Sequence, residues 1–253
     1  MARLLRTLRN NLGVQHRLFR VLTSTLGEIC MVMVGVLLAL WVNNWNDDRK
    51  DRIKERKILR EMNDNLASDL EDCRYNIGMN QRLLRGNTAV LKQLTERTPF
   101  HDSLRVHYGN ILGNTTLSAN IAAYDNLKSM GFNLVRNDSL RNMITTLYSQ
   151  QYRYMHDVEM EVDGKVQLEE VLPMMHAKVV VDTMWASAWP IDPEALMDDA
   201  SFKGMLRTNI FFRNWMIGRY KSLEKRIQAL QAMIGRELVK GQGPVNPTGL
   251  TGG

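Results

Sequence analysis

The sequence predicts an all-α protein, in which one N-terminal transmembrane helix continues into an extramembrane, antiparallel helical bundle with long coiled-coil-like helices. Two observations support this fold class. One is a single apolar stretch at residues 22–45, and the other is the recurrence of Leu, Met and Ile at helical spacing through the rest of the chain. Proline, which interrupts helices, occurs only six times in 253 residues.

Residues 1–21 form a basic amphipathic segment. Leucines recur among five arginines, and no acidic residue precedes Glu28. This pattern is typical of a short helix on an anionic membrane surface beside a span. The lipid bilayer is therefore an expected partner. Nucleic acid is not, because basic residues are not interleaved with aromatic residues as in a nucleic-acid-binding surface.

Residues 22–45 are the only stretch that a bilayer would accept as a transmembrane helix. No side chain from Ile29 to Val42 is charged or strongly polar. At helical rise the whole stretch covers roughly 36 Å, against a hydrocarbon core of about 30 Å. Trp41 and Trp45 lie where an interfacial aromatic belt is expected. Glu28 costs roughly 2.5–3.5 kcal/mol, which the surrounding Leu, Ile and Val residues offset.

The span also suggests how copies of the chain could associate. Gly27, Gly35, Ala39 and Asn43 follow one stripe at multiples of four residues, which permits close approach of two helices and predicts a homo-oligomer. Glu28 lies on an adjoining face and is the candidate intramembrane functional residue. It either extends to the interface, which we favour, or serves an oligomeric channel or proton pathway.

Residues 46–238 are predicted to form the bundle. The first long helix should continue to about Arg97, where Thr98-Pro99 stops it. Its seam repeats every seven residues from Leu70, with Asn80 and Asn87 at seam positions. The seam packs either within its own bundle, the favoured interpretation, or in an intermolecular coil.

The later elements follow from local start and stop signals. Ser118 should cap a helix that ends at Met130, with Gly131 in the left-handed conformation and an extended link over residues 132–135. Asn137 or Asp138 should cap the next helix, and Asp192-Pro193 should start another. Residues 156–168 fit a helix better than a hairpin, and a loop region separates them from the last long helix. The tail, residues 239–253, has no periodicity and is expected to be disordered.

No pattern of catalytic residues occurs, so neither a catalytic site, a cofactor nor a metal is expected. His101 and His107 are six residues apart, which does not suit a helical metal pair. Asp157, Glu159, Glu161 and Asp163 crowd beside His156, and a solvated acidic face is favoured over a divalent-cation site. Cys30 and Cys73 are too far apart along the helix for a disulfide.

Two groups of residues carry a family resemblance. The first combines LGEI at residues 26–29, GVLLAL at 35–40 and VNNWN at 42–46, and the second combines YDNLKSMG at 124–131 with LV at 134–135 and NDSLR at 137–141. Together they resemble an uncharacterised family of bacterial single-span membrane proteins, defined only as a domain of unknown function. Met130 and Trp41 depart from its usual pattern. The resemblance implies a bacterial membrane protein and no particular activity.

The resulting hypothesis is a membrane-anchored helical scaffold or sensory interaction module that is oligomeric and not an enzyme, with a further protein partner not identified by the sequence. It would lie in the bacterial inner membrane with its N-terminus in the cytoplasm and its bundle in the periplasm. The first flank has no acidic residue, whereas acidic residues follow the span, and this difference decides the orientation. The alternative is an oligomeric ion channel or proton pathway that uses Glu28.

Overall fold

The computed structural model confirms a mostly helical chain with long helices. It describes residues 2–240, and within residues 2–30 it describes the helical backbone but not the side chains. The first helix, α1, runs Ala2–Thr95, and the last, α8, runs Ala200–Lys240. The chain divides into two compact units, with the boundary between Lys54 and Glu55.

In the first unit, the described side chains begin at Met31 and their apolar members are exposed. Leu37, Leu38 and Trp41 are each more than half exposed. Beyond Val42 the helix surface becomes polar, and lysines pair with aspartates three residues before them, as in the 3.3 Å contact between Lys50 and Asp47. Among the residues that the structure describes, no helix is both long enough and apolar enough to cross a membrane.

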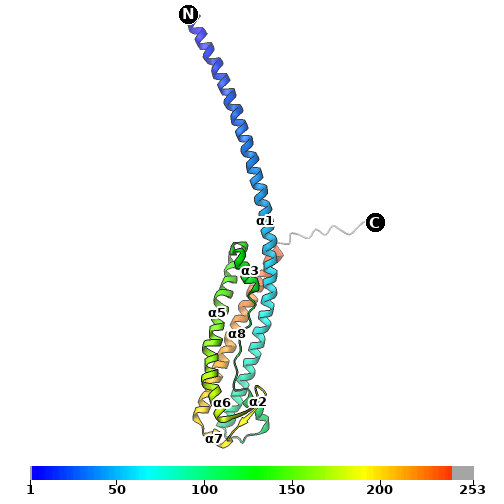
Figure 1. The fold of residues 1–253 in the computed structure, drawn as a ribbon, viewed down its shortest axis with the longest axis vertical. Helices are drawn as coiled ribbons and strands as arrows, with labels where there is room; N and C mark the ends of the chain where they lie inside the picture. Colours follow the sequence, from blue (N-terminus) through cyan, green and yellow to red (C-terminus); the bar gives the residue numbers. More distant parts are fainter. Residues whose placement is uncertain (1, 241–253) are drawn as a thin grey trace, which may run out of the picture. The chain divides into compact units, whose positions relative to one another are not determined.

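The second unit contains three long helical segments that lie alongside one another: residues 55–95 of α1, a continuous helix over residues 138–178, and α8 (Figure 1). The middle helix alternates α-helical and π-helical stretches: α4 Asp138–Thr146, η3 Leu147–Gln151, α5 Tyr152–Asp157, η4 Val158–Gly164, η5 Val166–Val171 and α6 Leu172–Lys178. The seam of α1 is buried within this chain, as Leu66, Cys73 and Leu94 show. The interpretation as an intrachain bundle is therefore confirmed.

Short elements close the two ends of the bundle. At one end α3, Ala122–Met130, is followed by a 3-10 turn, η2, Phe132–Leu134. At the other end lie η1 Asp102–Leu104, α2 Arg105–Gly109, α7 Pro193–Asp198 and a hairpin of β1 Val179–Thr183 and β2 Ser187–Pro190 (Figure 1).

The apolar core has two parts. The larger joins all three long segments and includes Met62, Ile144 and Leu230. The smaller lies under the hairpin and includes Tyr108 and Phe202. Each part is built from residues that recur every three or four positions on helices, so packing of amphipathic faces stabilises the bundle.

Several local expectations need correction. The expected loop after α6 contains the antiparallel hairpin, which pairs Val179 with Pro190 and Val180 with Trp189. Ser118 does not cap α3, which begins at Ala122 without a side-chain cap. Gly131 does end α3, but with φ 93° and ψ 131° it is outside the left-handed helical region. The expected extended link at residues 132–135 is a 3-10 turn over most of its length.

Other local expectations are confirmed. Asn137 caps α4 by accepting a hydrogen bond from the Leu140 amide, and Asp192 caps α7. Residues 156–168 are helical, so the hairpin alternative at that place is wrong. Helix α8 continues to Lys240, two residues past the expected end of the bundle, and the rest of the expected disordered tail lies outside the described residues.

Candidate functional site

An extended segment packs against the helices of the bundle, with residues 110–113 and 115 buried and residues 114, 116, 118 and 120 exposed. This connector, residues 110–120, joins α2 to α3 and runs along the helices (Figure 1). No strand within residues 2–240 pairs with it, and Asn110, Ile111 and Thr115 within it are buried. Because buried backbone groups need hydrogen-bond partners, side chains from the helices must provide them.

Side chains from α1, from α8 and from the turn that precedes β2 donate hydrogen bonds to the carbonyl oxygens of the connector. The donors and acceptors are Asn87 to Asn110 (3.3 Å) and Ile111 (3.1 Å), Asn209 to Ile111 (2.7 Å), Trp185 to Leu112 (3.1 Å), Arg213 to Gly113 (2.9 Å), Tyr220 to Thr115 (3.2 Å) and Asn76 to Thr116 (3.1 Å). Helices α1 and α8 therefore both donate hydrogen bonds to the connector, α1 through amide groups and α8 through amide, guanidinium and hydroxyl groups.

Side-chain oxygens accept from the connector's amide groups. The pairs are Gly113 to Gln167 (3.1 Å), Leu117 to Glu159 (3.0 Å), Ser118 to Asp72 (2.8 Å) and Asn120 to Asp69 (2.7 Å). We call the side chains that bind the connector, with Asn80 and Asp163, the polar core. The polar core performs the hydrogen bonding that a neighbouring strand would otherwise provide.

Arg213 and Asp163 form an ion pair at the centre of the polar core, and both side chains are fully buried. Arg213 also donates to Asn80 Oδ1 at 2.9 Å. Burial lowers the pKa of the Arg213 guanidinium to about 10. Among the described residues, Arg213 Nε and Asp163 Oδ2 have no hydrogen-bond partner. Loss of either charge would leave the other buried without compensation.

Glu159 is another buried carboxylate of the polar core, in addition to Asp163 and Asp69. Its Oε1 atom accepts from Tyr220 Oη at 2.6 Å and from the Leu117 amide, whereas Oε2 is buried and has no hydrogen-bond partner in the described part of the chain. Burial raises the pKa of Glu159, although these two hydrogen bonds oppose the shift, and burial also raises the pKa of Tyr220. A proton on Oε2 would leave both hydrogen bonds at Oε1 intact.

The expected solvated acidic face is wrong for two of its four members. Glu159 and Asp163 are fully buried, whereas Asp157 and Glu161 are exposed. The π-helical turns explain the difference. Their hydrogen bonds join residues i and i+5, so each turn contains more residues than an α-helical turn, and residues four apart, such as Glu159 and Asp163, stay on one face. That buried face consists of Met155, Glu159, Asp163, Gln167, Val171 and Met175.

The polar core holds the connector, and its chemistry fits that role. In the described part of the chain, no three His, Cys, Asp or Glu side chains are grouped to hold a metal ion. Asn80 and Asn87 were identified from the sequence as seam positions, but Asn209 and Arg213 were not. Their spacing on α8 was a signal, because polar residues on an otherwise apolar face predict buried partners.

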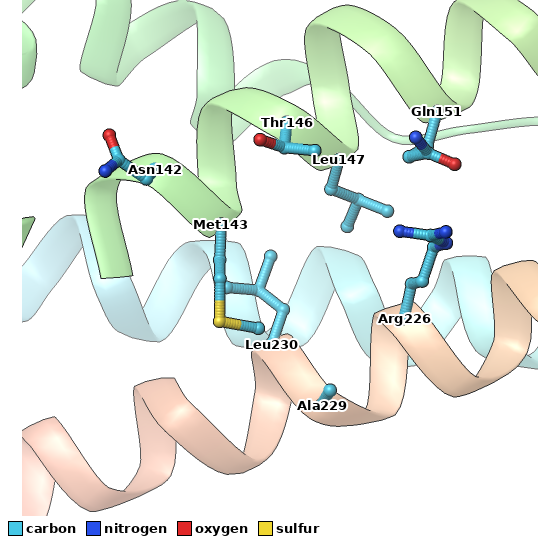
Figure 2. A pocket seen from close by; sticks show the side chains of 8 residues that line it. All are labelled: Asn142, Met143, Thr146, Leu147, Gln151, Arg226, Ala229 and Leu230. Carbon is cyan, nitrogen blue, oxygen red and sulfur yellow. The ribbon is translucent and has the colours of Figure 1, made fainter. Parts of the chain in front are cut away.

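A groove on the bundle surface is a second candidate site. It lies between residues 142–151 of the middle helix and residues 226–230 of α8, and has a volume of about 360 Å³. Figure 2 shows Met143, Leu147 and Leu230 at its apolar floor, with Arg226 directed toward Gln151. The π-helical segment η3 forms part of one wall.

The site residues proposed from the sequence belong to the first unit and are separate from the polar core in the chain. Side chains of Gly27 and Glu28 lie outside the described residues. Gly35, Ala39, Trp41, Asn43 and Trp45 are exposed on α1. A Cβ atom at Gly35 would meet no atom within 4 Å, and Asn43 donates to Asp47 at 3.3 Å.

Comparison with known proteins identifies one family. Residues 28–179 match the family of unknown function DUF6090, and this range includes the connector, Glu159 and Asp163. Searches of curated proteins and of solved structures give no match to the chain. Since the matched residues make up more than half of the chain, the protein belongs to this family of unknown function, DUF6090.

Proposed function

We propose that this protein is a single-span, membrane-anchored helical scaffold or interaction module that forms oligomers and acts without catalysis. Residues 22–45 would be its anchor, with Trp41 and Trp45 near an interface. Residues 55–240 would present a bundle surface to a protein partner. The proposed place is the bacterial inner membrane, with the N-terminus in the cytoplasm and the bundle in the periplasm.

One observation carries the anchor: the apolar side chains of residues 31–42 are exposed on every side of the helix. Their exposed fractions range from 54% at Val42 to 78% at Met31. Exposed apolar surface costs roughly 25 cal/mol per Å² in water, so a helix that is apolar all round requires an apolar environment. A bilayer would supply that environment over the whole stretch from residue 22 to 45.

The polar core supports a scaffold in the second unit. Its buried groups bind the connector and each other, and Glu159 and Asp163 are fully buried. Such groups favour one arrangement of the helices and connector, because any other arrangement would leave polar atoms unsatisfied. A single rigid arrangement suits a module that presents a fixed surface.

Membrane extraction tests the anchor. The full chain should remain in the membrane pellet after alkaline carbonate treatment, and Leu37→Arg with Leu38→Arg should shift it to the supernatant, since each central arginine costs roughly 2.5–3.5 kcal/mol. The control is Ile53→Arg with Tyr75→Arg, which places two arginines at exposed positions of α1 outside residues 22–45. Extraction of the wild-type chain, or retention of the Leu37→Arg/Leu38→Arg variant, would refute the anchor.

A reporter that is active only outside the cytoplasm tests the orientation. Fused after Leu238, it should be active if the bundle is periplasmic. A stable but inactive fusion would reverse the orientation without affecting the anchor itself.

A further inference from the structure

We propose that the groove between the middle helix and α8 binds an amphiphilic monocarboxylate, with its carboxylate at Arg226 and its aliphatic chain on Met143, Leu147 and Leu230. The groove lies wholly within the second unit. The proposal therefore does not depend on membrane anchoring or on oligomer formation.

The sequence makes room for a ligand in two ways. Ala229 places only a methyl group on the α8 side, and η3 departs from α-helical geometry on the opposite side. In a π-helical segment each backbone hydrogen bond encloses one more residue than in an α-helix, which displaces side chains from their α-helical positions. Such segments are frequent at functional sites. The resulting volume, about 360 Å³, is within the range of small-molecule sites.

The groove carries one positive charge, which has no ion-pair partner among the described residues. Arg226 is the only charged residue that lines it, and among the described residues Arg226 has no ion pair or side-chain hydrogen bond. Some other arginines of the bundle do have carboxylate partners: Arg74 contacts Glu224 at 2.9 Å, and Arg97 contacts Asp198 at 2.5 Å. A planar guanidinium binds a carboxylate through two parallel hydrogen bonds, so a carboxylate is the fitting partner.

The neutral polar groups around the floor are also available to a ligand. Thr145 and Ser149, which lie outside the groove lining, bond back to carbonyl oxygens of their own helix. Thr146, Asn142 and Gln151, which line the groove, have no side-chain hydrogen bond among the described residues. The lining therefore offers free donors around an apolar floor.

The arrangement of these groups defines the ligand's shape. Arg226 and Gln151 lie at one end of the groove, the apolar side chains lie in the middle, and Asn142 lies at the other end (Figure 2). At helical rise, Asn142 and Gln151 are roughly 13 Å apart along their helix. A medium-length aliphatic chain with one terminal carboxylate spans this distance.

Calorimetric titration of the full chain in lipid nanodiscs tests the proposal, with empty discs subtracted. The probes are octanoate, octanamide and octylammonium, which share a chain length and differ in charge. Octanoate should bind saturably and at least about tenfold more tightly than octanamide, and octylammonium should not bind. Arg226→Gln should abolish the preference for octanoate over octanamide. Ala229→Leu should weaken the binding of both compounds, because the larger side chain would occupy part of the groove.

Matched controls separate the groove from general effects on α8. Arg236→Gln removes another exposed arginine of α8, and Ala232→Leu adds the same apolar volume at an exposed alanine outside the groove. Both should bind octanoate as the wild-type chain does. Absence of saturable octanoate binding, equal binding of octylammonium, or unchanged binding by Arg226→Gln and Ala229→Leu would overturn the proposal.

Discussion

The two units of the chain place polar and apolar side chains in opposite ways. Along residues 31–42 of the first unit, large apolar side chains are exposed around the helix, whereas the second unit buries an arginine, several carboxylates and several amides. In water, both arrangements would be unfavourable without compensation. Each unit therefore needs groups that compensate for its own cost: cover for the exposed apolar side chains in the first unit, and hydrogen-bond partners for the buried polar side chains in the second.

In the second unit, the compensation is internal. The connector lies along the bundle without a partner strand among the described residues, so the carbonyl and amide groups of its buried residues, 110–113 and 115, need partners from the helices. Asn87, Asn209, Arg213, Tyr220 and Glu159 bind those groups directly. In the first unit, the described side chains of residues 31–42 have no comparable cover, which is why we propose a bilayer around them.

The largest expected effect comes from breaking the buried ion pair. Arg213→Met should lower the free energy of unfolding of the second unit by about 3–5 kcal/mol, because Asp163 would remain charged and buried without its partner. Urea unfolding followed by circular dichroism measures the change. The double variant Arg213→Met with Asp163→Leu should regain part of the loss. If both variants unfold at the wild-type urea concentration, the ion pair has no structural role.

A smaller effect should appear as a pH dependence of stability. Burial raises the pKa of Glu159, against hydrogen bonds from Tyr220 and Leu117 and the attraction of His156, while Asp72 adds to the rise. The folded state therefore holds this proton more tightly than the unfolded state does. Stability from this group is fully present below the ordinary pKa and is lost as pH rises through the raised folded value.

Glu159→Gln should make the unfolding free energy less dependent on pH in that window, as measured by urea unfolding at a series of pH values. Some dependence should persist, because burial also raises the pKa of Asp69. The control is Glu161→Gln on the same helix, where Lys165 lowers the pKa of an exposed carboxylate. A pH dependence that is identical in wild type and Glu159→Gln would contradict the assignment of the raised pKa to Glu159.

Local signals predicted much of the second unit. Thr98-Pro99 marked the end of α1 to within a few residues. Asn137 was one of two candidate caps of α4, and Asp192-Pro193 marked the start of α7, because a capping side chain acts on amides two or three residues away. The heptad seam predicted burial of Asn80 and Asn87 because position on a helix face is also a local property.

The parts that the sequence did not predict depend on distant partners. Arg213 is bound by Asp163, Asn80 and the carbonyl of Gly113, which are 50 to 133 residues away. Glu159 and Asp163 were assigned to a solvated face because the π-helical turns were not anticipated. The hairpin was missed because the stretch before the last long helix was interpreted as a loop region, although Val179, Val180 and Val181 favour a strand.

In the first unit, a moderate effect should appear in self-association. Gly35→Leu with Ala39→Leu should weaken association of spans in membranes by about 1–2 kcal/mol while leaving insertion intact, because close approach depends on small residues and insertion gains from leucine. A side chain at Gly35 meets nothing within 4 Å in the single chain, so folding of the chain should not change.

Oxidative crosslinking through Cys30 measures this association. The other cysteine should not interfere, because Cys73 is buried and its burial raises the pKa of its thiol to about 12. Gly78→Leu with Gly218→Leu is the control, since these glycines of the second unit also have open space at Cβ. Equal crosslinking of wild type and Gly35→Leu/Ala39→Leu would refute the small-residue stripe as the contact.

The smallest expected effect is that of Glu28→Gln, and it separates the scaffold from the channel. If Glu28 extends its carboxylate to the interface, its neutral isostere should change neither the thermal stability of the chain nor ion flux in liposomes. We expect no conductance from the purified full chain in planar bilayers. A path for ions would pass Met31, Val34 and Leu38, whose side chains are apolar and would hold no water column in a close contact. A reproducible cation-selective current that Glu28→Gln abolishes would replace the scaffold with the oligomeric channel.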